Sequence, residues 1–177
     1  QFDNTDRATM TYYKKTGGDL RFAVMTSPGI FGYENVETTG DVGRSNTLVA
    51  SPKSGRYTVS YFDNSTNQVK WARHEKGGKW NIKVAAQTSG GADFISMAYG
   101  YSYEPAISYY DAKGGDLKLS YYSANAKAFV VKALATSGAQ GLYSNAFFPS
   151  YYGQPAVFHY NRSQDRILLL RDAVDAN

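Results

Sequence analysis

Pro105-Ala106-Ile107-Ser108-Tyr109-Tyr110-Asp111, with Leu117 six residues further on, decides the fold, because the chain writes this pattern four times. In each copy an aliphatic residue stands eight positions after the first aromatic residue or its substitute. The other copies are Tyr12-Tyr13 with Leu20, Tyr61-Phe62 with Val69, and His159-Tyr160 with Ile167. The four aliphatic residues are 49, 48 and 50 positions apart in turn. A period of this length indicates an array of one repeated structural unit.

Each unit is predicted to consist of β-strands. Its segments alternate apolar and polar residues and are rich in Tyr, Phe, Val, Ile and Thr, and no helical period is found. In the third unit we expect strands at 94–99, 105–110, 117–122 and 129–135. Residues 111–116 link the second and third of these, and their Gly and Asp residues suit a tight turn with a positive φ angle. The same turn is expected at the equivalent segments, which are 14–19, 63–68 and 161–166.

Four short antiparallel strands in each unit predict an all-β fold, a β-propeller of four-stranded blades. We place the blade repeats at about 8–40, 45–88, 93–136 and 142–177 of a single propeller segment, 1–177. Residues 105–111, followed by Gly115-Asp116-Leu117-Lys118, resemble the blade repeat of secreted bacterial propellers grouped with the sialidase-like and lectin-like folds. The resemblance implies architecture only. The Ser-x-Asp-x-Gly-x-Thr-Trp turn of sialidases is not intact here, so no catalytic residue transfers.

The first and last units are each expected to have three strands. The first unit begins at its second strand, near Ala8, and the last stops after its third strand, 166–171. We expect, in order of preference, a fragment of a longer propeller, a ring completed by another chain, or a small four-bladed ring with two thin blades. A half ring would expose hydrophobic sheet faces, which soluble proteins avoid.

Composition fits a folded extracellular domain. The 177 residues include no cysteine, so a disulfide framework and thiolate metal sites are excluded. A chain that starts at Gln1 without Met is expected to be processed, which favours secretion. The net charge of +4 and the pI of about 9.1 come from scattered residues rather than a basic stripe, so nucleic-acid binding is not expected.

The sixteen tyrosines have a structural interpretation. Many fall at equivalent positions of the repeat, where aromatic residues form strands and pack between sheets. We therefore favour packing over the stacking of sugar rings. Trp71 is likewise assigned to the core, at the position of Phe22, Leu119 and Leu169.

The candidate ligand-binding residues lie in the loops between blades, 38–45, 87–93 and 136–143. In a propeller these loops surround the mouth of the central channel, and a site on a symmetric scaffold should differ from blade to blade. Ser45, Asp93 and Tyr143 are placed at equivalent positions, and Asp41 and Arg44 stand nearby. We predict ligand binding by Asp41, Arg44, Asp93 and Tyr143, against the simpler interpretation of solvated turns.

No metal ion, cofactor or catalytic group is predicted. Asp63, Asp111 and Asn161 recur at one turn and are explained by side-chain bonds to the local backbone. His159 replaces a packing tyrosine and is expected to have a hydrogen-bonded ring. A base-and-arginine set of His159, Tyr160 and Arg162 would suit a lyase only as a hypothesis.

The predicted function is therefore a non-catalytic extracellular module for recognition or scaffolding, which binds a glycan or a protein through its loops. Further blades from the same protein or a second chain are expected to complete it. The alternative is a propeller lyase that acts on uronate polymers. No membrane span is expected, because no apolar run approaches about 18 residues.

Overall fold

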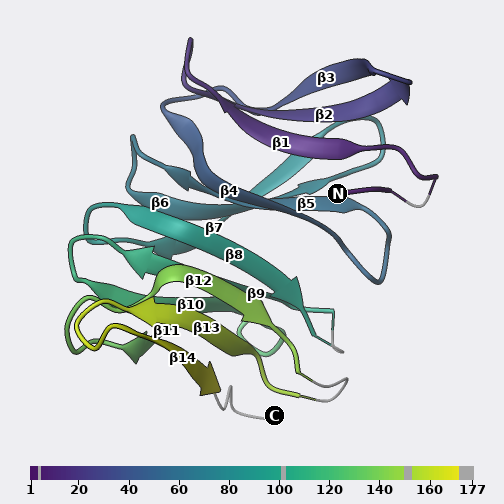
Figure 1. The fold of residues 1–177 in the computed structure, drawn as a ribbon. Coiled ribbons are helices and arrows are strands. Elements are labelled where there is room, and N and C mark those ends of the chain that lie inside the picture. Colours follow the sequence, from purple (N-terminus) through teal and green to yellow (C-terminus); the bar gives the residue numbers. More distant parts are fainter. Residues whose placement is uncertain (4, 101–102, 150–152, 172–177) are drawn as a thin grey trace.

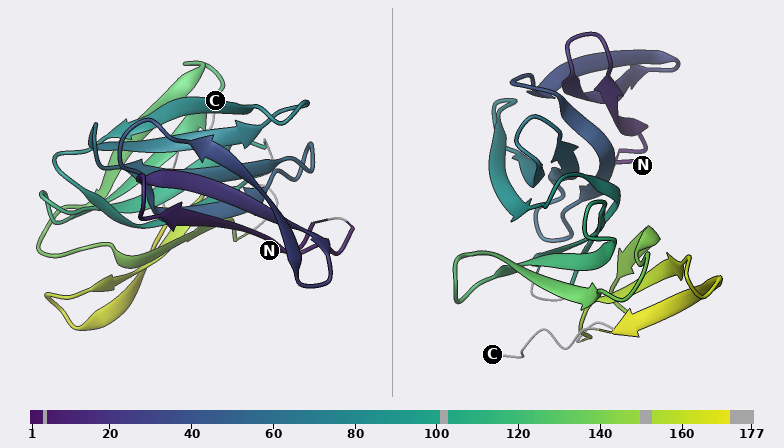
Figure 2. Two further views of the ribbon diagram at one scale, coloured as in Figure 1. Left: turned by 90° about the horizontal axis from the view of Figure 1, so that it is seen from above. Right: turned by 90° about the vertical axis from the view of Figure 1, so that its left-hand side faces the viewer.

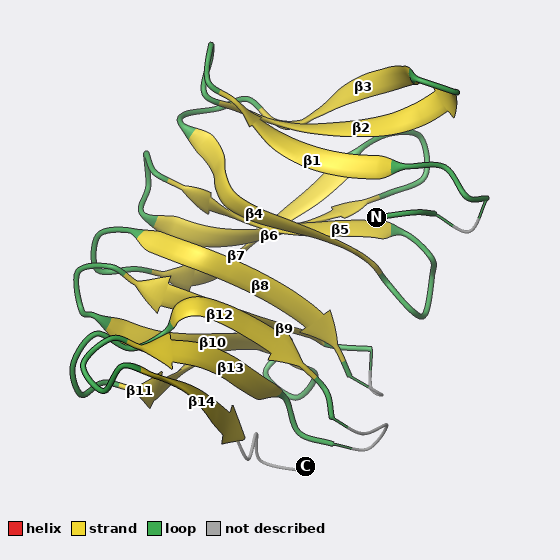
Figure 3. Ribbon diagram, viewed as in Figure 1, coloured by secondary structure: helices red, strands yellow, loops and turns green. Residues whose placement is uncertain are grey.

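The computed structural model describes residues 1–3, 5–100, 103–149 and 153–171 (Figure 1). These residues form fourteen β-strands and no helix (Figure 3), which confirms the all-β prediction. Parts of the predicted fourth repeat, 150–152 and 172–177, lie outside the described residues.

Four antiparallel sheets follow one another in chain order (Figure 2). The first sheet contains β1 (Thr9–Lys14), β2 (Asp19–Ser27) and β3 (Ile30–Glu37). The second contains β4 (Val42–Ala50), β5 (Tyr57–Asp63), β6 (Gln68–His74) and β7 (Trp80–Gln87). The third contains β8 (Ala92–Tyr99), β9 (Pro105–Asp111), β10 (Asp116–Ser123) and β11 (Ala128–Ala135), and the fourth β12 (Leu142–Phe147), β13 (Ala156–Asn161) and β14 (Arg166–Arg171).

The turn predicted after each aromatic pair is present in all four sheets. At one equivalent position of every turn the backbone is left-handed: Gly18 (φ 72°), Asn67 (55°), Gly115 (71°) and Asp165 (50°). Gly has no Cβ to clash in this conformation, and Asn and Asp tolerate it better than other residues. The turn chemistry therefore sets the hairpins β1–β2, β5–β6, β9–β10 and β13–β14.

Each sheet packs on the next through the same positions of the repeat. We call the face toward the next sheet the leading face and the face toward the previous sheet the trailing face. Leading faces contribute buried pairs on β2, β6 and β10, namely Leu20 and Phe22, Val69 and Trp71, and Leu117 and Leu119. Trailing faces contribute buried pairs on β5, β9 and β13, namely Val59 and Tyr61, Ile107 and Tyr109, and Val157 and His159. Burial on both faces explains why adjacent aromatic residues can both be packed.

The first strands of the second, third and fourth sheets, β4, β8 and β12, lie side by side (Figure 1). They are joined by repeated hydrogen bonds: the Ser45 hydroxyl accepts from the Ile95 amide (3.1 Å), and the Ser96 hydroxyl accepts from the Ala146 amide (3.1 Å). These three strands are therefore the inner strands of the sheets.

The strand counts of three, four, four and three agree with the prediction for the described residues. At the free edge of β1, Phe2 forms a single antiparallel bridge with Ala8 in place of an inner strand. The antiparallel sheets are thus established, whereas their closure into a propeller stays a prediction.

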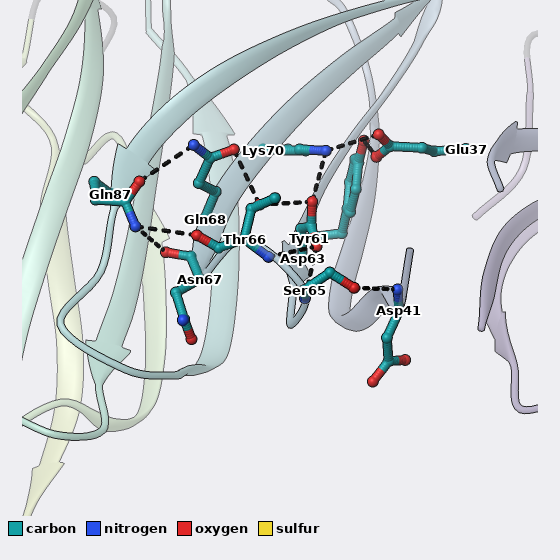
Figure 4. A network of polar contacts seen from close by, with 10 residues as sticks. All are labelled: Glu37, Asp41, Tyr61, Asp63, Ser65, Thr66, Asn67, Gln68, Lys70 and Gln87. Carbon is teal, nitrogen blue, oxygen red and sulfur yellow. Dashed lines mark hydrogen bonds and ion pairs between the residues drawn. The ribbon is translucent and has the colours of Figure 1, made fainter. Parts of the chain in front are cut away.

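A polar network links the first and second sheets (Figure 4). The Lys70 ammonium lies 2.7 Å from a carboxylate oxygen of Glu37 on β3 and 2.7 Å from one of Asp63 on its own sheet. The buried Tyr61 hydroxyl donates to Glu37 at 2.6 Å. Although burial alone would raise the pKa of Asp63, hydrogen bonds from Lys70 and Thr66 hold that pKa below its ordinary value. One cation thus compensates two carboxylates across the interface.

The recurring acidic residue also stabilises its own turn, as predicted for Asp63. Its carboxylate accepts the backbone N–H of Ser65 (2.9 Å) and the hydroxyl of Thr66 (2.7 Å) (Figure 4). Asn161 accepts a backbone N–H three residues further on (3.2 Å). Asp111 instead forms an ion pair with Lys118 at 2.6 Å and accepts the hydroxyl of Ser89 at 2.6 Å, so it joins the third sheet to the connection that precedes it.

Candidate functional site

A pocket of about 290 Å³ opens between the second and third sheets, at the end where β4 leads into β5 and β8 into β9. We call it the intersheet pocket. It is lined by Ser51, Lys53, Ser54, Trp71, Arg73, Lys83, Tyr99, Tyr103, Glu104, Pro105, Tyr122 and Phe129.

Differences between repeats at one packed pair of residues account for the opening. In the interface of the first and second sheets, the ring of Tyr57 packs on Phe22, with centroids 4.8 Å apart. In the interface of the second and third sheets Trp71 stands at the position of Phe22, and Pro105 stands at the position of Tyr57. The smaller proline ring leaves the space beside Trp71 unfilled, and this space is the pocket.

Aromatic side chains in fixed positions form the apolar part of the pocket. The Trp71 indole N–H donates to the Tyr99 hydroxyl at 3.3 Å, which donates to the Thr58 hydroxyl at 3.0 Å. Phe129 contacts Trp71 with ring centroids 6.1 Å apart and Tyr122 at 5.4 Å. Because the polar atoms of Trp71 and Tyr99 are satisfied by the protein, these rings offer a rigid apolar surface to a ligand.

Three cations surround these rings. Lys53 lies over the ring of Tyr103 (5.7 Å), Arg73 over Trp71 (5.7 Å) and Lys83 over Tyr122 (5.0 Å). Arg73 also forms an ion pair with Glu75 at 2.6 Å. Within the described residues, no carboxylate lies within ion-pair distance of Lys53 or Lys83, so their charges are available to an anionic ligand.

Glu104 is the carboxyl group of the pocket. Burial raises the pKa of Glu104 above its ordinary value, and the positive charges of Lys53 and Lys83 offset this only in part. A carboxyl group with a raised pKa keeps its proton in weakly acidic solution and can donate it. The pocket therefore combines stacking surfaces, two available ammonium groups and one acid.

Of the sequence-predicted site residues, the structure brings together Asp41 and Arg44. Their ion pair measures 3.0 Å, Asp41 accepts the hydroxyl of Tyr13 at 2.6 Å, and Arg44 lies 5.3 Å from the Tyr13 ring. The hydrogen bond from Tyr13 is the main cause that lowers the pKa of Asp41, and the charge of Arg44 adds to it. Both residues lie at the opposite end of β4 from the intersheet pocket.

The other two predicted residues lie apart from this pair. Tyr143 is exposed and packs on Phe94, with ring centroids 4.6 Å apart, and Asp93 is exposed beside it. No hydrogen bond or ion pair between described residues joins Asp93 or Tyr143 to Asp41 or Arg44. Ligand binding by these four residues stays a prediction.

The equivalence assumed for Asp93 needs a correction. The residues that share a left-handed backbone on the inner strands are Ser45 (φ 45°), Phe94 (53°) and Tyr143 (52°). Asp93 pairs with Tyr110 as Arg44 pairs with Phe62, so Asp93 is one position out of register. The cause is the connection between β8 and β9, which is one residue shorter than the connection between β4 and β5.

The lyase hypothesis is not supported by the geometry of its three residues. His159 is buried, and its Nδ1 accepts the Gly141 amide at 3.1 Å, as expected of a packing residue with a hydrogen-bonded ring. Burial also lowers the pKa of His159. Tyr160 points to the other face of β13 and donates to Asp165 at 2.6 Å, while Arg162 is exposed in the following turn. They do not form one site.

Searches of the described residues give two further findings. They contain no group of three His, Asp or Glu side chains placed to hold a metal ion. Nor do they include a helix with the length and apolar character of a membrane span.

The intersheet pocket was not predicted from the sequence, and Trp71 shows why. Trp71 is a core residue, as predicted, but one edge of its ring also lines the pocket. Two features of the sequence indicate the pocket. Proline stands at position 105, where the second repeat has Tyr57. In addition, Lys53 and Glu104 lie in two loops of different sequence, at the same end of the second and third sheets.

Comparison with known proteins gives limited similarity. No protein-family model matches the chain, and no curated protein matches it. One solved structure with similarity is an endo-1,4-beta-xylanase from Bacteroides thetaiotaomicron VPI-5482, with a TM-score of 0.48 and 11% sequence identity. The match covers 97% of this chain and 78% of that chain. The sialidase-like and lectin-like propellers that the repeat resembles are not identified.

This comparison corrects the predicted function. The prediction of a non-catalytic module for recognition or scaffolding is not upheld; the solved structure reported above bears the name endo-1,4-beta-xylanase. The uronate lyase alternative is dropped with it, because its three residues do not converge.

Proposed function

We propose that this protein acts on an anionic carbohydrate, which it binds in the intersheet pocket. The observation that carries the proposal is the placement of Lys53, Lys83 and Glu104 around the rings of Trp71 and Tyr122. Sugar rings have apolar faces that stack on aromatic side chains, while carboxylate or sulfate groups attract ammonium groups. A pocket with both features selects charged sugars over neutral ones.

Glu104 is assigned the role of proton donor to the glycosidic oxygen. Cleavage of a glycosidic bond requires a carboxylic acid that is still protonated when the substrate binds, and a raised pKa provides it. The pKa of Glu75 is instead lowered, mainly by the hydrogen bond from Arg73, so Glu75 stays ionised and holds the Arg73 guanidinium at the pocket.

We also propose that the four sheets are consecutive blades of a β-propeller. This is supported by the chain-order sheets, by the repeated leading and trailing faces, and by the adjacent inner strands β4, β8 and β12. A secreted or cell-surface location is proposed as well, since acidic polysaccharides are abundant outside cells. Fractionation of the native host tests that location.

The binding proposal predicts that Lys83→Ala weakens affinity for a sulfated oligosaccharide about tenfold, because a tenfold change corresponds to about 1.4 kcal/mol, a typical contribution of one charge contact. Titration followed by calorimetry and by Trp71 fluorescence measures the change. Lys113→Ala, an exposed lysine in the turn at the other end of the third sheet, serves as the matched control. Equal affinity of the wild-type protein for neutral and sulfated oligosaccharides would contradict the proposal.

The catalytic assignment predicts that Glu104→Gln lowers the rate of polymer cleavage about 100-fold, the usual scale for loss of a general acid, and leaves binding nearly unchanged. Release of reducing ends from a panel of acidic polysaccharides measures the rate. Because Glu104 must be protonated, activity should fall as the pH rises through its raised pKa. If the wild-type protein binds the polymers but releases no product, Glu104 is not a catalytic acid.

A further inference from the structure

The fourth sheet exposes, on its leading face, the positions that the other sheets bury against their neighbours. Ile167 stands at the position of Leu20, Val69 and Leu117, which are fully buried, yet it is 75% exposed. Leu169 stands at the position of Phe22, Trp71 and Leu119 and is 42% exposed. Among the described residues no further sheet packs on these side chains.

Two phenylalanines enlarge this apolar face. Phe158 on β13 is 43% exposed, and its ring stacks on Phe147 of β12 with centroids 5.0 Å apart and an interplanar angle of 11°. We call Phe147, Phe158, Ile167 and Leu169 the leading end face. Three exposed apolar residues and the half-buried Phe147 on one sheet face are unusual for a surface in contact with water.

The first sheet exposes the complementary positions on its trailing face. Met10 stands at the position of Val59, Ile107 and Val157, which are fully buried, and is 44% exposed. Tyr12 stands at the position of Tyr61 and Tyr109, and its ring meets the edge of Tyr33, with centroids 6.4 Å apart. Tyr33 is 63% exposed. We call Met10, Tyr12 and Tyr33 the trailing end face.

The internal interfaces provide the precedent for joining the two end faces, because each of them packs a leading face on a trailing face. One position departs from the repeat. Phe158 replaces the small hydroxyl residues Thr11, Ser60 and Ser108. Thr11 bonds Asn46 on the next inner strand at 2.6 Å, and Ser108 bonds Ser144 at 3.2 Å.

Phe158 indicates which surface can pack on the leading end face. A sheet with a complete inner strand leaves room only for a small side chain there, as Ser108 shows. Among the described residues, the first sheet contains no inner strand and has only the bridge between Phe2 and Ala8 at that edge. The trailing face of a first sheet therefore has room for the Phe158 ring, whereas a sheet with a complete inner strand does not.

We propose that the leading end face binds the trailing end face of a second copy of this chain. The contact is heterologous, since it joins two different surfaces. It extends the internal packing across the boundary between chains, and repetition of it closes a ring or forms an open chain of copies.

The proposal is tested by light scattering on the full chain over a range of concentrations. We expect particles with at least twice the 19.5 kDa mass of the chain. Leu169→Glu and Met10→Glu should each raise the dissociation constant at least about 30-fold, as burial of a charge in an apolar contact costs about 2 kcal/mol or more. Val131→Glu, at an exposed apolar position of β11 outside both end faces, should change it little.

Mixing the two variants distinguishes this contact from others. Leu169→Glu keeps an intact trailing end face and Met10→Glu an intact leading end face, so a mixture should form a one-to-one complex that neither forms alone. Association that persists in both single variants, or a wild-type chain that stays monomeric, overturns the proposal. Thermal unfolding checks that both variants fold, and Ile167→Lys provides a second test of the leading end face.

Discussion

Lys70→Met should lower the free energy of unfolding by about 3 kcal/mol, because breaking a buried ion pair leaves its partners uncompensated. Lys70 lies 2.7 Å from both Glu37 and Asp63, and Asp63 is almost fully buried. Without the ammonium group, two carboxylates face each other across the interface of the first and second sheets. Urea unfolding followed by tryptophan fluorescence measures the change.

The pH dependence of this effect follows from the pKa of Asp63, which is lowered in the folded protein from its ordinary value of 3.8. The stabilisation is complete above that value and is lost as the pH falls through the lower, folded pKa. The difference between wild type and Lys70→Met should therefore shrink below about pH 4.

Lys118→Met is the matched control for Lys70→Met. Lys118 occupies the same position in the third sheet but is close to a single buried carboxylate, Asp111, at 2.6 Å, and its side chain is more exposed. Lys118→Met should therefore lower the free energy of unfolding less than Lys70→Met does. If the two variants are equally stable, the bridge from Lys70 to Glu37 contributes little to the interface.

Much of the fold could be predicted because the repeat specifies local structure four times over. The hairpin turns follow from Gly18, Asn67, Gly115 and Asp165, because Gly has no Cβ to clash in a left-handed backbone and Asn and Asp tolerate it. Alternation along β5 and β9 correctly predicted residues packed on both faces. The bulges on the inner strands were not predictable, since they depend on hydrogen bonds between strands about fifty residues apart, such as Ser45 with Ile95.

The candidate site was harder to predict, for a physical reason. A pocket is defined by missing volume, and the sequence shows missing volume only when residues that pack together are compared across repeats. Trp71 indicates a core position by itself. Only the pairing of Trp71 with Pro105, where Phe22 pairs with Tyr57, predicts an opening.

Pro105→Tyr should abolish measurable binding of sulfated oligosaccharides, because it restores at the pocket the residue that fills the equivalent space beside Phe22. The tyrosine ring would occupy the volume next to Trp71 and separate the ligand from Lys83 and Glu104. Calorimetry measures binding, and Trp71 fluorescence reports the new ring contact without ligand. The fold should be retained, since Tyr57 is compatible with the same position at the start of β5.

Pro105→Ala is the control for this substitution, because it removes the proline ring and leaves the space open. It should bind within about threefold of wild type, a difference of less than 1 kcal/mol. Undiminished binding by Pro105→Tyr would show that the ligand does not occupy the intersheet pocket. The pair Asp41 and Arg44 would then be the next place to test, since it lies at the other end of β4 and would be untouched by a ring at position 105.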